Sequence, residues 1–169
     1  TSIGIHNTTP IKLVSEGTFK FDNTSVGSNN VSNRSAIFFE EASNLDFKGS
    51  SLTDIKSNYY GFVSLWDIGY NNKANDPMRF TARSPRIRVQ GSSTFKVESN
   101  NDCLHYVNRF IVENENGSQC NATISLKTSG STTYCISMPR NVNTSTKDPE
   151  KHYLVFNSAV RANIACTVS

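Results

Sequence analysis

The chain has 169 residues, of which 36% are hydrophobic and 18% charged, and its formal net charge is +3. Length and composition predict one folded domain over 1–169 and exclude a disordered chain, which carries more charge and fewer aromatic residues. The weak, dispersed positive charge argues against nucleic-acid binding. The sequence holds no apolar run long enough to cross a bilayer, so no membrane insertion is expected. It also opens without a leader pattern, which predicts a mature or trimmed N-terminus.

The N-terminal third reads as short strands separated by turn formers. Strands are expected over 2–6, 11–15 and 17–22, with Thr8-Thr9-Pro10 and Glu16-Gly17 as breaks. A polar loop over 23–35 and a strand over 35–41 follow. The pattern over 43–58 is ambiguous and leaves room for one short helix.

Residues 59–80 hold the only tryptophan and form the most aromatic stretch of the chain. Apolar residues occupy both the even and the odd positions of this stretch, and alternate residues of a strand point to opposite faces. The pattern therefore predicts a central strand covered on both faces. A loop rich in Asn and Asp then runs to Pro77. Sugars present hydroxyl groups that suit Asn and Asp and apolar ring faces that suit Trp and Tyr. The predicted ligand-binding residues are therefore Trp66, Asp67, Tyr70, Asn71, Asn72, Asn75, Asp76 and Arg79.

The segment 83–98 alternates between apolar and polar residues and predicts a β-hairpin around Gly91-Ser92-Ser93. In that register Ile87 faces Val97, and Arg88 lies opposite Lys96 on the outer face. Two interpretations of this face stay open, an ordinary solvated strand surface and an anion-binding face. The basic residues of the second interpretation are Arg83, Arg86, Arg88 and Lys96, with Arg79 nearby.

A second hairpin is predicted over 106–127, because Asn116-Gly117 is a type I′ turn pair between two alternating runs. Its register places Val107 opposite Leu126 and leaves Arg109 as the one charged residue on the apolar face. A last strand is predicted over 159–168, in which Val160 and every second residue after it face inward.

The strands recur about every ten residues, and no long stretch has apolar residues at helical spacing, so the sequence predicts an all-β fold. The expected architecture is an antiparallel β-sandwich, immunoglobulin-like or jelly-roll-like, with at most one or two short helices. No convincing internal repeat is evident.

Four cysteines lie in the C-terminal half, at Cys103, Cys120, Cys135 and Cys166. Their spacing does not match a zinc site, and their even number predicts two disulfides formed in an oxidising compartment. The favoured pairing is Cys103 with Cys120 and Cys135 with Cys166. Four buried free thiols in a reducing compartment are the alternative.

The sequence contains no catalytic motif, and its three histidines lie far apart. We therefore expect no enzyme activity, no catalytic residues, no cofactor and no metal site. N-glycosylation triplets begin at Asn7, Asn23, Asn30, Asn33, Asn116, Asn121 and Asn143. Their number exceeds chance only slightly, so it does not separate a bacterial from a viral or eukaryotic surface protein.

An exported, all-β chain rich in Asn, Ser and Thr, with few cysteines and a closing strand that ends ANIACTVS, resembles the N-terminal lectin domain of bacterial chaperone–usher fimbrial tip adhesins. The resemblance covers the whole chain in composition and layout, and it carries over no individual site residue. It implies an extracellular domain on a cell-surface fimbria that binds a host glycan or glycoprotein receptor without catalysis. It also implies a pilin domain after Ser169 and a periplasmic chaperone as partners. A receptor-binding domain of a viral envelope glycoprotein is the alternative, and a secreted hydrolase is a third possibility.

Overall fold

The computed structural model describes residues 3–5, 11–15, 17–23, 37–39, 43–64, 86–105, 107, 109–130, 134–137 and 153–168. Within these ranges the regular structure is all strand, with no helix. The strands are β1 Ile3–Ile5, β2 Ile11–Ser15, β3 Thr18–Asn23, β4 Ile37–Phe39, β5 Ser43–Phe47, β6 Leu52–Ser57, β7 Phe62–Ser64, β8 Arg86–Val89, β9 Thr94–Ser99, β10 Leu104–His105, β11 Arg109–Val112, β12 Thr123–Thr128, β13 Tyr134–Ser137, β14 Tyr153–Phe156, β15 Asn163–Ala165 and β16 Thr167–Val168.

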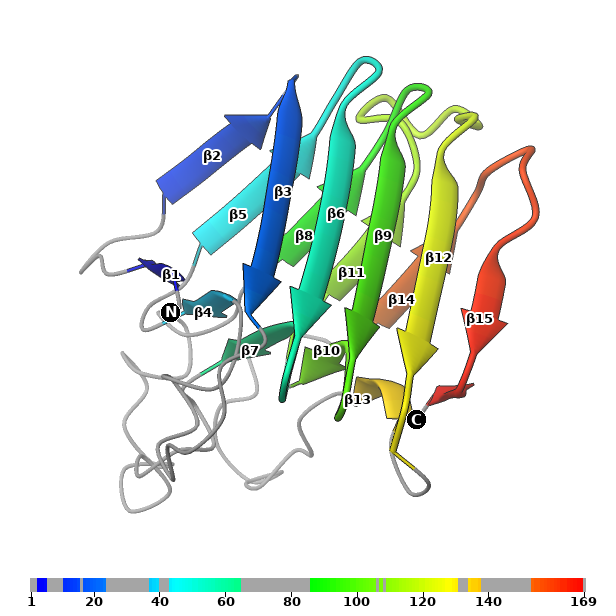
Figure 1. The fold of residues 1–169 in the computed structure, drawn as a ribbon. Helices are drawn as coiled ribbons and strands as arrows, with labels where there is room; N and C mark the ends of the chain where they lie inside the picture. Colours follow the sequence, from blue (N-terminus) through cyan, green and yellow to red (C-terminus); the bar gives the residue numbers. More distant parts are fainter. Residues whose placement is uncertain are drawn as a thin grey trace, which may run out of the picture.

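The described strands build three parallel sheets, and each strand from β1 to β13 pairs with the strand three places further along the chain. Sheet A has the order β1-β4-β7-β10-β13-β16, sheet B the order β2-β5-β8-β11-β14, and sheet C the order β3-β6-β9-β12-β15. Figure 1 shows sheet C in front of sheet B, with sheet A closing the lower side. The chain therefore winds as a parallel β-helix. We number its coils 1 to 5, each with one strand from every sheet, beginning with β1–β3.

The prediction of an antiparallel sandwich is wrong, because all the strand pairs within the described ranges are parallel. The strands expected near 86–90 and 94–98 exist as β8 and β9, but they lie in different sheets. Ile87 pairs with Leu45 and Phe110 of the neighbouring coils, not with Val97. The Gly91 turn moves the chain from sheet B to sheet C, and it does not fold one strand back on the other. Alternation shows only that one face of a strand is buried; it does not identify the neighbouring strand.

The second predicted hairpin fails for the same reason. Asn116-Gly117 lies in the connection from β11 to β12, and these strands belong to sheets B and C. Arg109 pairs in register with Arg86 of β8, so it does not lie on the apolar face of a hairpin. The predicted last strand is likewise divided into β15 in sheet C and β16 in sheet A.

Columns of apolar side chains run through the coils and fill the space between the three sheets. One column follows the register Leu45, Ile87 and Phe110, all buried. Another column follows Ile55, Val97 and Leu126. Sheet A contributes Ile37, Phe62, Leu104 and Ile136. Close packing inside the stack therefore comes from residues far apart in sequence, so single strands have little stability on their own.

Strand β7 is covered on both faces, as the aromatic stretch predicted. Phe62 and Val63 are adjacent and point to opposite faces, yet both have 0% exposed surface. The rest of that predicted strand, 65–70, lies outside the described residues.

The turns between sheets B and C are also stacked on one another. Gly49 and Gly91 have φ angles of 63° and 66°, which favour glycine. The Ser92 amide donates to the Gly49 carbonyl at 2.8 Å, and the buried Ser51 hydroxyl donates to Ser93 at 2.9 Å. These contacts join coils 2 and 3 at the turn as well as along the strands.

Only one of the two predicted disulfides is present. Cys135 and Cys166 are bonded, with Cα atoms 5.3 Å apart, which confirms that pair. Cys103 and Cys120 are free and buried, so the prediction of a second disulfide is wrong. Cys103 lies in the apolar core, where burial raises the pKa of its thiol from 9.0 to about 11. Hydrogen bonds with Ser99 and with the Lys127 carbonyl lower this pKa, but by less than burial raises it.

Candidate functional site

A polar groove lies at the ends of three neighbouring strands of sheet C. Its cavity has a volume of about 230 Å³ and is lined by Lys56, Ser57, Asn58, Glu98, Ser99, Asn100 and Ser129. Three consecutive coils supply these residues, through β6, β9 and β12 and the residues that follow each strand. The same positions of the coil carry polar residues each time, so the groove runs across the strands.

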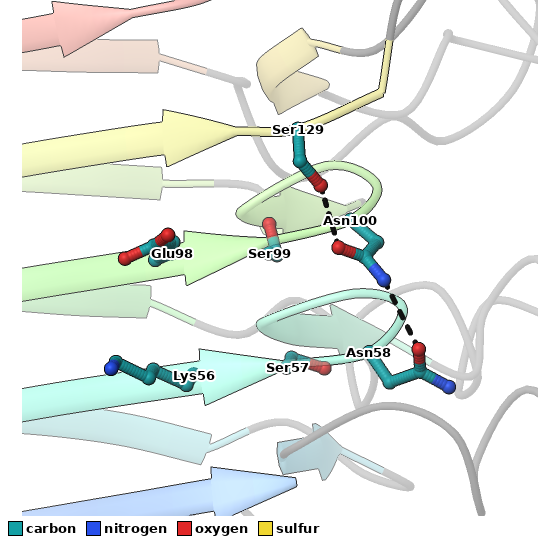
Figure 2. A pocket seen from close by; sticks show the side chains of 7 residues that line it. All are labelled: Lys56, Ser57, Asn58, Glu98, Ser99, Asn100 and Ser129. Carbon is teal, nitrogen blue, oxygen red and sulfur yellow. Dashed lines mark hydrogen bonds between the residues drawn. The ribbon is translucent and has the colours of Figure 1, made fainter. Parts of the chain in front are cut away.

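Hydrogen bonds link the three coils along the rim of this groove. The Asn100 side-chain amide donates to Asn58 Oδ1 at 3.1 Å, and the Ser129 hydroxyl donates to Asn100 Oδ1 at 2.5 Å. Figure 2 shows this chain of contacts passing from one strand end to the next. Asn100 and Ser129 are exposed, and each can make further hydrogen bonds, because an amide offers two N–H groups and two lone pairs and a hydroxyl accepts as well as donates.

The serines beside these residues have a structural role. Ser57 donates to the Tyr60 carbonyl and Ser99 to the Asn101 carbonyl, each at 2.5 Å. Both serines are buried. They fix the bend from sheet C towards sheet A, and thereby hold Asn58 and Asn100 at the rim.

Opposite charges alternate from strand to strand beside the groove. Lys56 pairs in register with Glu98, and Glu98 with Lys127. Lys56 is exposed and Glu98 half-buried. Figure 2 shows the Lys56 and Glu98 side chains on adjacent strands, further back along the strands than the Asn58 and Asn100 amides. The groove is therefore close to neutral overall and rich in hydrogen-bonding groups.

Aromatic rings follow the groove directly in the chain. Tyr59 comes after Asn58 and its ring lies 4.2 Å from that of Tyr60, which stacks on His105 at 4.0 Å and 6°. Behind this stack, His105 Nδ1 lies 2.7 Å from a carboxylate oxygen of Asp102. The other carboxylate oxygen of Asp102 accepts a hydrogen bond from the Tyr134 amide at 2.9 Å. The Asp102–His105 pair is buried and ties coil 4 to coil 5, which is a supporting role.

The predicted ligand-binding loop cannot be compared with this groove. Trp66, Asp67, Tyr70, Asn71, Asn72, Asn75, Asp76 and Arg79, together with Arg83, lie outside the described residues. The prediction for this loop stays a prediction.

The structure divides the predicted anion face between two sheets. Arg86 and Arg88 belong to β8 in sheet B, whereas Lys96 belongs to β9 in sheet C. Arg86 forms an ion pair with Asp46 at 3.1 Å. Arg109 pairs with Arg86 in register, so Arg109, and not Lys96, is the basic neighbour of β8. The hairpin register that placed Lys96 opposite Arg88 is wrong.

Sequence reasoning missed the groove, although the sequence contains its signal. Gly-Ser-Ser occurs at 49–51 and again at 91–93, and Ser-Asn at 57–58 and again at 99–100. Both pairs are 42 residues apart, and they fall at matching positions of coils 2 and 3. This repeat, together with Thr128-Ser129 at the same place in coil 4, locates the stacked turn and the groove.

The described ranges contain neither a cluster suited to a metal ion nor a membrane-spanning helix. No group of three or more His, Cys, Asp or Glu side chains is placed to hold a metal ion among these residues. The same part of the chain has no helix long and apolar enough to span a membrane.

Comparison with known proteins identified no relative: no family model, no curated protein and no solved structure matches this chain.

Proposed function

We propose that this chain is an extracellular, non-catalytic glycan-binding domain, and that the groove over coils 2 to 4 is its binding site. The observation that carries the proposal is the hydrogen-bonded series Asn58, Asn100 and Ser129 on an open surface. Amides and hydroxyls both donate and accept, as sugar hydroxyls do. The nearby Tyr59 offers an aromatic ring of the kind that packs against the apolar face of a sugar.

Location outside the cytosol is part of this proposal. The Cys135–Cys166 disulfide supports it, because disulfides form and persist in oxidising compartments and are rare in the cytosol. The parallel β-helix departs from the sandwich fold that belongs to fimbrial lectin domains. Host-glycan binding on a cell-surface fimbria, with a pilin domain and a chaperone as partners, therefore stays a prediction from the resemblance alone.

A glycan array followed by direct binding measurements tests the proposed site. For an array glycan that binds, we expect Asn100→Ala to weaken affinity by about tenfold or more, equal to about 1.4 kcal/mol, because it removes the central hydrogen-bonding group. Lys56→Ala should weaken binding as well. Lys96→Ala is the matched control, since Lys96 is also an exposed lysine of sheet C but does not line the groove.

The salt dependence of binding distinguishes the groove from the arginines of sheet B. A ligand in the near-neutral groove should bind almost equally at low and high salt. An acidic glycan held by the half-buried Arg86 and Arg88 should still bind less tightly as salt rises, because dissolved ions screen the attraction between charges at the protein surface beyond about 8–10 Å at physiological ionic strength. Unchanged affinity in both groove variants, with melting temperatures unaltered, would place the site elsewhere.

The viral receptor-binding alternative rests on the glycosylation triplets. Asn116 and Asn121 are both exposed near the turn that joins β11 to β12, so both are accessible acceptors. Mass spectrometry of the natively produced protein distinguishes the two origins. Glycans on these residues would favour the viral alternative, and unmodified asparagines would favour a bacterial adhesin.

A further inference from the structure

We propose that the ligand of this groove is a linear polysaccharide that lies across the strands, so that successive sugar units contact successive coils. The inference rests on the proposed function and adds the class of ligand and its orientation. It follows from the repetition of the same polar positions from coil to coil.

The groove repeats its chemistry at each coil. The row one residue before the strand ends is Lys56, Glu98 and Lys127, of which Lys127 lies outside the cavity lining, and the row two residues further is Asn58, Asn100 and Ser129. Each coil therefore presents one charged side chain and one amide or hydroxyl group at the same height. Such a surface offers equivalent contacts to a ligand that is itself a chain of similar units.

The spacing of the rows suits a sugar chain. Neighbouring parallel strands lie about 4.8 Å apart, so three coils span roughly 10 Å from the first row to the third. The length that one sugar unit adds to an extended polysaccharide is similar to this spacing between neighbouring strands. A linear glycan along the coils would remain in step with the side-chain rows over several units, whereas a glycan along a strand would leave the groove.

The size of the cavity also favours an extended ligand. Its volume of about 230 Å³ lies below the range of about 300–1,000 Å³ found for sites that enclose a drug-sized molecule. A single sugar in this open site would bury little surface. Useful affinity therefore requires contacts repeated over neighbouring coils.

The register defines where the polar rows end. On the coil 1 side, Asp22 and Asn23 occupy the positions of Lys56 and Ser57. On the coil 5 side, Ala165 occupies the position of Lys127, so the charged row stops there. Three to four sugar units is therefore the length that the rows accommodate.

A series of oligosaccharide lengths tests this inference. The probes are fragments of one to six units of β-1,4-linked glucose, β-1,4-linked N-acetylglucosamine and α-1,4-linked galacturonic acid, titrated against the intact chain beside the glycan array. For a series that binds, affinity should rise about tenfold for each unit up to the third or fourth and then by less than about threefold. Ser129→Ala should end the rise one unit earlier, because it removes the contact of coil 4. Lys96→Ala should leave the length profile unchanged.

The outcomes separate this inference from the proposed function. If glycans bind but a trisaccharide is no tighter than its monosaccharide, the groove holds one terminal sugar, and the linear arrangement is wrong while glycan binding stands. If neither the array glycans nor the three series bind, the proposed function itself fails. Because Ser129 is exposed and lies outside the core, its variant is expected to fold, and an unchanged melting temperature confirms this.

Discussion

The stacked turns between sheets B and C provide a sharp test of the coil arrangement. A Cβ atom added to Gly91 would lie 2.5 Å from the Gly49 carbonyl oxygen and 3.1 Å from the Gly49 nitrogen. Both atoms belong to the backbone and cannot rotate away. The same oxygen accepts the hydrogen bond from the Ser92 amide. Gly91→Ala must therefore displace the turn of coil 2 as well as strain its own.

Two other glycines divide this effect into parts. Gly49 has a φ of +63° but no heavy atom within 4 Å of its added Cβ, so Gly49→Ala measures backbone strain alone. That strain is about 1–2 kcal/mol for an L residue in the left-handed region. Gly17 has open space and no positive φ. Gly17→Ala should therefore stabilise the fold slightly, by about 0.4–1 kcal/mol, by restricting the unfolded chain.

Gly91→Ala combines strain with a displaced carbonyl and a weakened hydrogen bond, and we expect a loss of about 2–4 kcal/mol. Since 1 kcal/mol shifts the melting temperature by about 2–4 °C in a chain of this size, the loss should be roughly 6–12 °C for 3 kcal/mol. Thermal unfolding followed by circular dichroism gives the comparison. Equal losses for Gly91→Ala and Gly49→Ala would show that the two turns are not in contact, and the stacking argument would fail.

Three further predictions concern the core and the cysteines. Phe110 and Phe156 both belong to inward positions of sheet B, but Phe156 is 44% exposed in the last coil and Phe110 is 2% exposed. Phe110→Ala should cost about 3–5 kcal/mol and Phe156→Ala clearly less, as denaturant unfolding would show; equal costs would contradict the inferred core. Reduction of the Cys135–Cys166 bond, with its sequence separation of 31, should cost about 3.5 kcal/mol, and an unchanged melting temperature after reduction would contradict this. The folded-state pKa of Cys103 is raised, so the protonated thiol stabilises the fold below pH 9, and that stability should be lost as pH rises from 9.0 through about 11. Cys103→Ala should remove this part of the pH dependence, and identical pH profiles for variant and wild type would refute the assignment.

The positions of several strands were predictable from the sequence, but their partners were not. The segment 43–58, which left room for a short helix, forms β5 and β6 instead, and β14 was not predicted. The strand predicted over 11–15 is present as β2, and those predicted near 86–90 and 94–98 as β8 and β9. Alternation places one face of each strand inward, and this holds both in a sandwich and in a coil of a β-helix. The choice between the two folds depends on residues one coil away. For Ile87 these partners are 42 residues earlier and 23 residues later in the chain.

Unequal coil lengths concealed the repeat that would have identified the fold. Repeat architectures are found in a sequence by a constant period, and the distances between register partners here vary with the connecting segments. Gly-Ser-Ser recurs once, at 91–93, and Ser-Asn occurs at several other places besides 57–58 and 99–100, so the two matched pairs do not stand out. The second predicted disulfide was wrong for a related reason, because Cys103 and Cys120 are close in sequence but belong to connections at different corners of the coil.

The β-helix separates the residues that hold the fold from those that can change its ligand. Inward positions such as Phe95 and Leu126 are fully buried and contact the coils on both sides, so their replacement carries the cost of a cavity. Rim residues such as Asn100 contribute exposed hydrogen bonds, each with a small net effect on stability of about 0.5–1.5 kcal/mol. A groove built from such rim positions can therefore be altered one coil at a time without disturbing the stack. This independence is the physical reason to expect that variants of Asn58, Asn100 and Ser129 change binding while their melting temperatures stay near that of the wild type.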